Sequence, residues 1–330
     1  MNIIGIDEAG YGPNLGPLVI SGSVWSQPQW EPESSENPVE VLTRRLLQCG
    51  AVAGSLKDQN AGKGAIFIAD SKIVYKSNGS LKPLLDTVLA VLQPTLPVGD
   101  FAGGWTSRNL FTALDPDCDA AMSENPWDRE YCEPLSVPLE IVQQFQSALA
   151  ASQIETPRLF SKVVFPREFN ENVEHFGSKG TAHAHWVLGL VRRILDRLPQ
   201  TGEPIMVLSD KLGARNRYAS LIYTVFEEAM VQTVQESAEK SEYRFSFGNR
   251  AVNLSFQVRG ERFLPVALAS MTSKLLRELA MCGFNAFWQK RLPGLRVTAG
   301  YPVDAKRFLG EIASFLKEHQ VPESLLWREK

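Results

Sequence analysis

The sequence predicts an α/β fold in which a mixed sheet carries helices on its faces. Two strand candidates come first, at 2–7 and 18–25, and they are antiparallel if the Gly- and Pro-rich loop between them returns the chain. Later, the apolar run 205–209 ends in Asp210, which is typical of a buried parallel strand. Antiparallel strands followed by strand–helix units favour a mixed sheet.

The other elements follow from local patterns in the chain. Further strands are expected at 65–69, 159–165, 241–247 and 252–257. Helices are expected at about 38–49, 81–93, 138–150, 180–198, 264–290 and 304–317. Residues 94–136 are loaded with Pro, Gly, Asp and Trp and show no sustained period. We therefore expect a single domain over 1–330, with an irregular insertion at about 94–150 and a helical C-terminal part at about 264–330.

Composition excludes several classes of protein. The chain has 330 residues, 44% of them hydrophobic and 22% charged, with a net charge of −3. This is a globular composition without an all-over basic surface, although a local basic groove remains possible. The four cysteines form no C-x-x-C pair, which argues against a zinc ribbon and favours a reducing compartment. We expect no signal peptide, no membrane span and a cytoplasmic location.

Acidic residues stand where predicted strands end. They are Asp7 with Glu8, Asp70 and Asp210. A single acid at such a place is commonplace, because it caps or forms a turn. Several acids at one sheet edge repel one another unless a divalent cation neutralises them, and Mg²⁺ prefers oxygen ligands. Two such ions about 4 Å apart can clamp both oxygens of a phosphodiester.

Several motifs, in a fixed order, resemble the ribonuclease HII family. Residues 5–13 read Gly-Ile-Asp-Glu-Ala-Gly-Tyr-Gly-Pro, and Gly-Pro-Leu-Val-Ile follows at 16–20. The later matches are Asp-Ser-Lys at 70–72, Val-Leu-Ser-Asp at 207–210, the helix with 269–278, and Gly-Tyr-Pro at 300–302, followed by Lys306. Together they cover about two-thirds of the chain and leave out the stretch near 94–150.

The resemblance implies a ribonuclease H-like fold and an endonuclease that uses two Mg²⁺ or Mn²⁺ ions. Its substrate would be RNA in RNA–DNA hybrids, or ribonucleotides embedded in DNA. By position, the catalytic and metal-binding acids would be Asp7, Glu8, Asp210 and Glu278. The substrate-binding residues would be Gly10, Tyr11, Gly12, Lys72, Lys274 and Tyr301.

Two residues depart from the family pattern, and both fall on the implied site. Tyr11 stands where the glycine loop normally carries a basic residue, and Glu278 stands where the fourth acid is normally Asp. Two alternatives therefore stay open. One is a ribonuclease H-like nucleic-acid-binding protein with weak or lost catalysis, and the other is a different nuclease of this fold, such as a DNA-junction or transposon enzyme. The glycine loop and the late Gly-Tyr motif favour the ribonuclease.

Two groups of residues have both a structural and a functional interpretation. His183 and His185 are two residues apart, so they do not share a helical face and a two-histidine metal site is disfavoured. Lys211, Arg215 and Arg217 follow Asp210 with no acid between them. They form either a solvated turn or phosphate contacts beside the acids.

Overall fold

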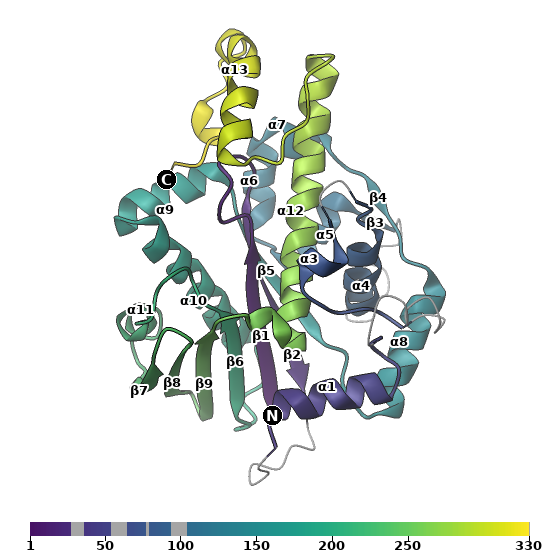
Figure 1. The fold of residues 1–330 in the computed structure, drawn as a ribbon, viewed down its shortest axis with the longest axis vertical. Helices are drawn as coiled ribbons and strands as arrows, with labels where there is room; N and C mark the ends of the chain where they lie inside the picture. Colours follow the sequence, from purple (N-terminus) through teal and green to yellow (C-terminus); the bar gives the residue numbers. More distant parts are fainter. Residues whose placement is uncertain (28–35, 54–64, 77–78, 94–103, 330) are drawn as a thin grey trace.

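A mixed sheet forms the centre of the computed structural model (Figure 1). The structure describes residues 1–27, 36–53, 65–76, 79–93 and 104–329. Within these residues, seven strands form one sheet in the order β5-β2-β1-β6-β9-β8-β7. Their bounds are β1 (Asn2–Ala9), β2 (Leu18–Ser26), β5 (Arg158–Val164), β6 (Ile205–Asp210), β7 (Gln232–Glu236), β8 (Lys240–Phe247) and β9 (Arg250–Gln257).

The sheet combines both strand directions, as predicted. β1 is antiparallel to β2 and parallel to β6, and β6 is parallel to β9. The outer pairs β2–β5, β8–β9 and β7–β8 are antiparallel. In register, Ile6 lies opposite Ser209, so Asp7 and Asp210 reach the same edge of the sheet on neighbouring strands.

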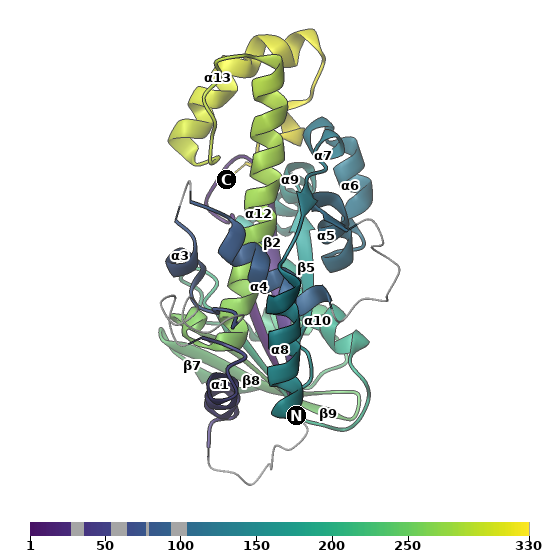
Figure 2. The ribbon, with the colours of Figure 1, turned by 90° about the vertical axis from the view of Figure 1, so that its right-hand side faces the viewer.

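Helices cover both faces, which confirms the predicted fold class (Figures 1 and 2). The long helix α12 (Leu264–Arg291) crosses one face and packs on β1 and β2. On the other face, α10 (Lys179–Arg197) packs on β2 and β5, and α11 (Ala219–Val225) packs on α10. Alternate residues of β1 serve the two cores: Ile3 belongs to the α12 side, whereas Ile4 and Ile6 belong to the α10 side.

The end of α12 extends beyond the sheet and carries a third core (Figure 2). Helix α13 (Pro302–Glu318) packs there, with Phe308 5.4 Å from Phe284 between ring centroids. The short helix η3 (Glu323–Leu325) follows. The predicted helix at 264–290 is confirmed within one residue, because a long buried helix leaves a sustained local pattern.

The predicted irregular insertion needs correction where the structure describes it. Residues 104–150 form short elements, which are β3 (Trp105–Thr106), α5 (Ser107–Leu114), α6 (Cys118–Glu124), α7 (Pro126–Glu130), β4 (Pro134–Leu135) and α8 (Leu139–Ala151). The elements before α8 are too brief to show a sustained period, so the sequence pattern misses them, whereas α8 confirms the helix predicted at 138–150. Trp127 packs against Phe284 and Trp288 and so fastens this segment to α12. Residues 94–103 lie outside the described residues.

Most of the remaining elements lie beside α12. They are α1 (Pro38–Gln48), α3 (Ser71–Val74), α4 (Lys82–Leu92) and η2 (Gly260–Arg262). Helix α9 (Pro166–Phe176) instead packs on α10, on the other face of the sheet. The strand expected at 65–69 is wrong: Ile66 makes only an isolated bridge to Val52. The acid after it, Asp70, is the N-cap of α3, where its carboxylate accepts the Lys72 N–H. Across the described residues, no helix is long and apolar enough to cross a membrane.

Candidate active site

Acidic side chains gather at the carboxyl ends of β1 and β6. Asp7 and Glu8 come from β1, and Asp210 ends the neighbouring β6. A further acid, Glu261, arrives from η2, between β9 and α12. These acids interact electrostatically. The charges of Asp7, Asp210 and Glu261 act on Glu8, and the charges of Glu261 and Asp210 act on Asp7. We call these four residues the acid cluster.

Burial and mutual repulsion disfavour the charged forms of the acid cluster. Burial, followed by Glu261 and Asp210, raises the pKa of Asp7 to about 7. Burial and the neighbouring acids also hold the pKa of Glu8 well above its usual range. The pKa of Asp210 is raised by burial and then by Glu261. The raised pKa values of Asp7, Glu8 and Asp210 mean that the protein's own groups would compensate the negative charge of these carboxylates only in part.

Backbone geometry brings the four acids together. Asp7 lies on the α12 side of β1, where the Ser270 hydroxyl hydrogen-bonds its carboxyl. The backbone oxygen of Asp7 accepts a 3.0 Å bond from the Ser273 hydroxyl. Asp210 Oδ1 accepts the Gly260 N–H at 2.9 Å. A Cβ at Gly260 would lie only 2.9 Å from the Asp210 nitrogen, so a glycine permits this close approach. The contact carries Glu261 to the end of β6.

Glu8 lies on the opposite side of β1, toward α10. Its Oε1 is 3.8 Å from Nε2 of His183, a buried nitrogen that finds no hydrogen-bond partner among the described residues. Burial and the charge of Lys179 lower the pKa of His183 to about 3, so its imidazole is neutral at pH 7. His183 is therefore an uncharged neighbour of Glu8 and not its counter-ion.

Glu278, the fourth expected acid, is paired with other side chains in the structure. Its carboxylate accepts the Lys274 ammonium at 2.7 Å and the Tyr75 hydroxyl at 3.3 Å, and it lies 3.7 Å from Arg277. Lys274 thus pairs with Glu278 and not with the acid cluster. The electrostatic interactions described above join Asp7, Glu8 and Asp210 with Glu261. The metal-binding role of Glu278 stays a prediction.

A sequence signal for Glu261 exists, although it was not used above. Asp7 and Asp210 were selected because they end predicted strands. Glu261 follows the strand predicted at 252–257 after only three residues, Val258 to Gly260. The same criterion, applied to this strand, selects Glu261.

The donor chemistry of the acid cluster fits a divalent cation. Four carboxylates supply only oxygen ligands, as Mg²⁺ and Mn²⁺ prefer, and burial and neighbouring acids raise the pKa of Asp7, Glu8 and Asp210. Over the described residues, however, no three His, Cys, Asp or Glu side chains converge closely enough to hold one ion as they stand. Cation binding therefore requires the side chains to turn toward a shared ion.

Two buried arginines contact the interior side of the glycine loop that follows β1. Gly10 has a φ of +93°, and a Cβ there would lie 2.6 Å from Cδ of Arg277. Arg328, only 1% exposed, donates from Nη2 to the backbone oxygens of Gly10 and Pro13. Asn14 and Arg328 also exchange two 2.8 Å hydrogen bonds through the backbone of Arg328. No local pattern in the sequence indicates this role for Arg328.

The other residues expected to bind substrate lie around this loop. The Asn14 N–H donates to Gly300 O at 2.8 Å, which brings Tyr301 beside Gly12: a Cβ on Gly12 would lie 3.9 Å from Cε1 of Tyr301. The Tyr301 side chain is 57% exposed. Tyr11 stacks on His183, with 4.6 Å between ring centroids. The loop and Tyr301 thus form one exposed surface next to Glu8.

Two of the expected cations contact protein groups directly. Lys72 Nζ lies 3.2 Å from Glu261 Oε1, so in the structure it pairs with the acid cluster. Lys211 Nζ donates to the backbone oxygens of Arg215 and Ser237 and to the Ser241 hydroxyl. Its role is to hold the turn after β6 against β8.

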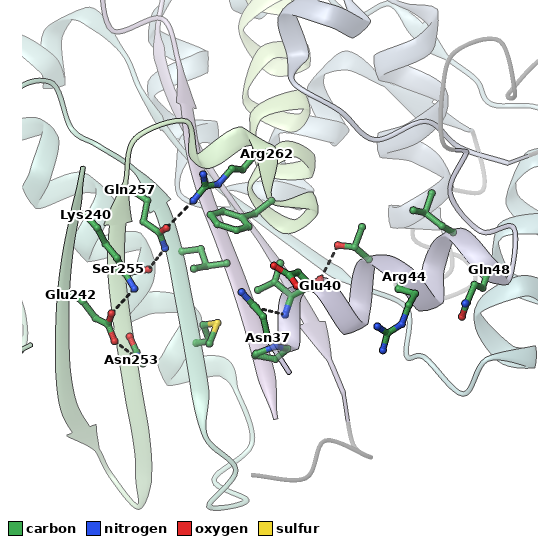
Figure 3. Close-up of a pocket in the computed structure, with 17 residues that line it drawn as sticks. Asn37, Glu40, Arg44, Gln48, Lys240, Glu242, Asn253, Ser255, Gln257 and Arg262 are labelled. Carbon is green, nitrogen blue, oxygen red and sulfur yellow. Dashed lines mark hydrogen bonds and ion pairs between the residues drawn. The ribbon is translucent and has the colours of Figure 1, made fainter. Parts of the chain in front are cut away.

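A groove of 1130 Å³ lies beside the acid cluster but does not include it (Figure 3). It runs along the open part of the sheet between α1 and strands β6, β9 and β8. Charges of both signs line it, among them Glu40, Arg44, Lys240 and Glu242. This balance differs from the one-sign surface that attracts a phosphate backbone, so the groove carries no nucleic-acid assignment.

Comparisons with known proteins give structural relatives only. No family model and no curated protein matches the sequence. Among solved structures, ribonuclease HII of Archaeoglobus fulgidus, solved with PCNA, is 14% identical over 100% of this chain and 95% of that chain, with a TM-score of 0.41. Ribonuclease H2 of Pyrococcus horikoshii is 15% identical over 99% and 92%, also with a TM-score of 0.41. Ribonuclease H3 of Aquifex aeolicus is 14% identical over 99% and 71%, with a TM-score of 0.39.

The chain is thus similar to ribonucleases HII and H3. At these identities and TM-scores, the motifs and the geometry of the acid cluster carry the functional inference.

Proposed function

We propose that this protein is a divalent-metal-dependent endonuclease that cleaves RNA in RNA–DNA hybrids or at ribonucleotides embedded in DNA. The acid cluster carries the proposal: Asp7, Glu8, Asp210 and Glu261 come from β1, β6 and the turn after β9 at one sheet edge, and the pKa values of the first three are raised. The ordered family motifs support the reaction class. Glu261 replaces Glu278 in the proposed metal-binding set.

Mg²⁺ or Mn²⁺ would be held by the acid cluster and would activate water and stabilise charge on the scissile phosphate. The protein's own residues orient the carboxylates. Ser270 holds Asp7, the Gly260 N–H holds Asp210, and Lys72 holds Glu261. These contacts keep the three carboxylates at one sheet edge, from which they would turn toward a shared ion.

The glycine loop and Tyr301 would recognise ribose. Telling RNA from DNA requires contact with the 2′-OH, which both donates and accepts hydrogen bonds. The backbone at Gly10 and Gly12 can approach a sugar because no side chain blocks it. The exposed Tyr301 ring beside Gly12 offers an apolar face to the neighbouring sugar.

The proposal is tested by cleavage of three matched duplexes: an RNA–DNA hybrid, a DNA duplex with one ribonucleotide, and an all-DNA duplex. Each is incubated with Mg²⁺, Mn²⁺ or EDTA. We expect cleavage of the first two, dependence on metal, and a loss of about 100-fold or more in Asp210→Asn. Cleavage that persists in EDTA or in Asp210→Asn would contradict the proposal.

A second candidate is a binding protein of this fold without cleavage. Tyr11 at the position of the loop cation favours it, because the loop itself then offers no charged phosphate contact. Tight binding of the hybrid without metal-dependent cleavage would support this candidate. Cleavage of the all-DNA duplex would indicate another nuclease of the same fold.

A further inference from the structure

Two cations from other elements surround Tyr11. Lys179, the first residue of α10, places Nζ 4.4 Å from the centroid of the Tyr11 ring. Arg215, in the turn after β6, places Nη2 3.7 Å from the position of a Cβ on Gly180. We propose that Lys179 and Arg215 bind a backbone phosphate of the nucleic-acid substrate and so replace the cation that the glycine loop lacks. This inference rests on the function proposed above.

Lys179 is held by aromatic rings from two sides. Besides the Tyr11 contact, its Nζ lies 5.7 Å from the Phe169 ring centroid. An ammonium over a ring face is attracted by the ring and keeps N–H groups directed away from it. Ser178 caps the helix by accepting the Thr181 N–H at 3.1 Å, which fixes the backbone of Lys179. The Tyr11 ring thus positions the positive charge of the Lys179 ammonium beside the glycine loop.

Arg215 is positioned by its backbone and not by an acid. Lys211 Nζ and the Tyr218 hydroxyl both donate to the Arg215 backbone oxygen, at 3.3 and 3.0 Å. None of the ion pairs found among the described residues involves the Arg215 guanidinium. Burial and then the charge of Glu8 raise the pKa of the Tyr11 hydroxyl, and the charge of Arg215 offsets this rise in part. Tyr11 therefore stands between a cation and the acid cluster.

The surface next to the two cations suits an anion. Gly180 follows Lys179 and has no side chain, and apart from its own chain neighbours and helix backbone a Cβ there would meet only the Arg215 guanidinium within 4 Å. Both cations stand at the N-terminus of a 19-residue helix, the end that favours negative charge. The stack from Lys179 through Tyr11 to His183 ends 3.8 Å from Glu8. A phosphate bound here would therefore lie on the strand that crosses the acid cluster.

The test measures binding of an RNA–DNA hybrid by fluorescence anisotropy over a range of salt concentrations, in Mg²⁺. An Asp7→Asn background keeps the hybrid intact. We expect Lys179→Met and Arg215→Met each to weaken binding about 10-fold at low salt and to reduce the salt slope by about one. Lys179→Arg keeps the charge and should bind as the background does. The matched control is Arg158→Met, which removes a charge at the opposite end of the sheet and should change neither quantity.

Gly180→Asp separates phosphate binding from helix stability. An acid in the first turn of α10 favours the helix, so the melting temperature should be unchanged or higher. The same carboxylate lies next to the two cations, so binding should fall by at least as much as in Lys179→Met. Tyr11→Arg should restore binding to the Lys179→Met variant.

The outcomes separate this inference from the proposed function. If the wild type cleaves the hybrid but Lys179→Met and Arg215→Met bind like Arg158→Met, the phosphate site is wrong and the proposed function stands. If the wild type neither binds nor cleaves the hybrid, the proposed function fails and the phosphate site fails with it.

Discussion

Replacing Asp7 with Asn should stabilise the protein when no divalent metal is bound. Asp7 is buried beside other acids, and its pKa rises from 3.8 to about 7. Asn has nearly the same shape and can still hydrogen-bond the Ser270 hydroxyl, but it carries no charge. A shift of about three pKa units corresponds to about 4 kcal/mol, so we expect a gain of about 2–4 kcal/mol in unfolding free energy at pH 8.

The sign of the pH dependence follows from the raised pKa. The unfolded Asp7 ionises near pH 4, whereas the folded one stays protonated until about pH 7. Its contribution to stability is therefore complete below pH 4 and is lost as the pH rises to 7. The difference between Asp7→Asn and the wild type should grow between pH 5 and pH 8. Adding Mg²⁺ should stabilise the wild type and leave the variant unchanged.

Urea denaturation in EDTA at pH 5 and pH 8 measures this effect. Asp115→Asn is the matched control, because Asp115 is also buried but pairs with Arg193 at 2.8 Å and accepts the Val163 N–H. That substitution should destabilise the protein at both pH values. An Asp7→Asn variant that is no more stable than the wild type at pH 8 would refute the idea of uncompensated charge.

Two further predictions concern other buried groups. Arg328→Met should lower the unfolding free energy by about 1–3 kcal/mol and speed hydrogen exchange at residues 10–16, because the backbone oxygens of Gly10 and Pro13 lose their donor. The control Arg44→Met removes an exposed ion pair and should change neither quantity. Equal effects in the two variants would contradict the prediction. Burial raises the pKa of Asp128 to about 7, so its contribution to stability should fall as pH rises from 4 to 7. Denaturation across this pH range should show a smaller fall for Asp128→Asn than for the wild type, and parallel curves would contradict the assignment.

Local patterns predicted the elements that hold the site. The strands at 2–7, 18–25 and 205–209 and the helix at 264–290 appear within a few residues of their predicted bounds. Each is a run of apolar residues long enough to specify its own period, and each packs in a core. The mixed sheet followed from their order, and the closeness of Asp7 and Asp210 followed from the strands that they end.

The rest of the site depends on contacts between distant residues. The resemblance pointed to Glu278 on α12 and did not point to Glu261, which precedes the helix and follows β9. Arg328 lies 318 residues from Gly10 in sequence, and only the fold brings them together. Arg215 was among the cations noted after Asp210, but Lys179 was hidden, because it starts a helix whose predicted bounds gave no reason to place it over the loop.

Metal-dependent cleavage of the RNA–DNA hybrid by Glu261→Gln and Glu278→Gln tests the acid cluster most directly. Both substitutions remove one carboxylate charge and keep the side-chain length, one beside Asp7 and Asp210 and the other beside Lys274 and Arg277. We predict that Glu261→Gln loses about 100-fold or more in rate in Mg²⁺, while Glu278→Gln stays within a few-fold of the wild type. Full activity in Glu261→Gln together with a collapse in Glu278→Gln would contradict the assignment of the acid cluster.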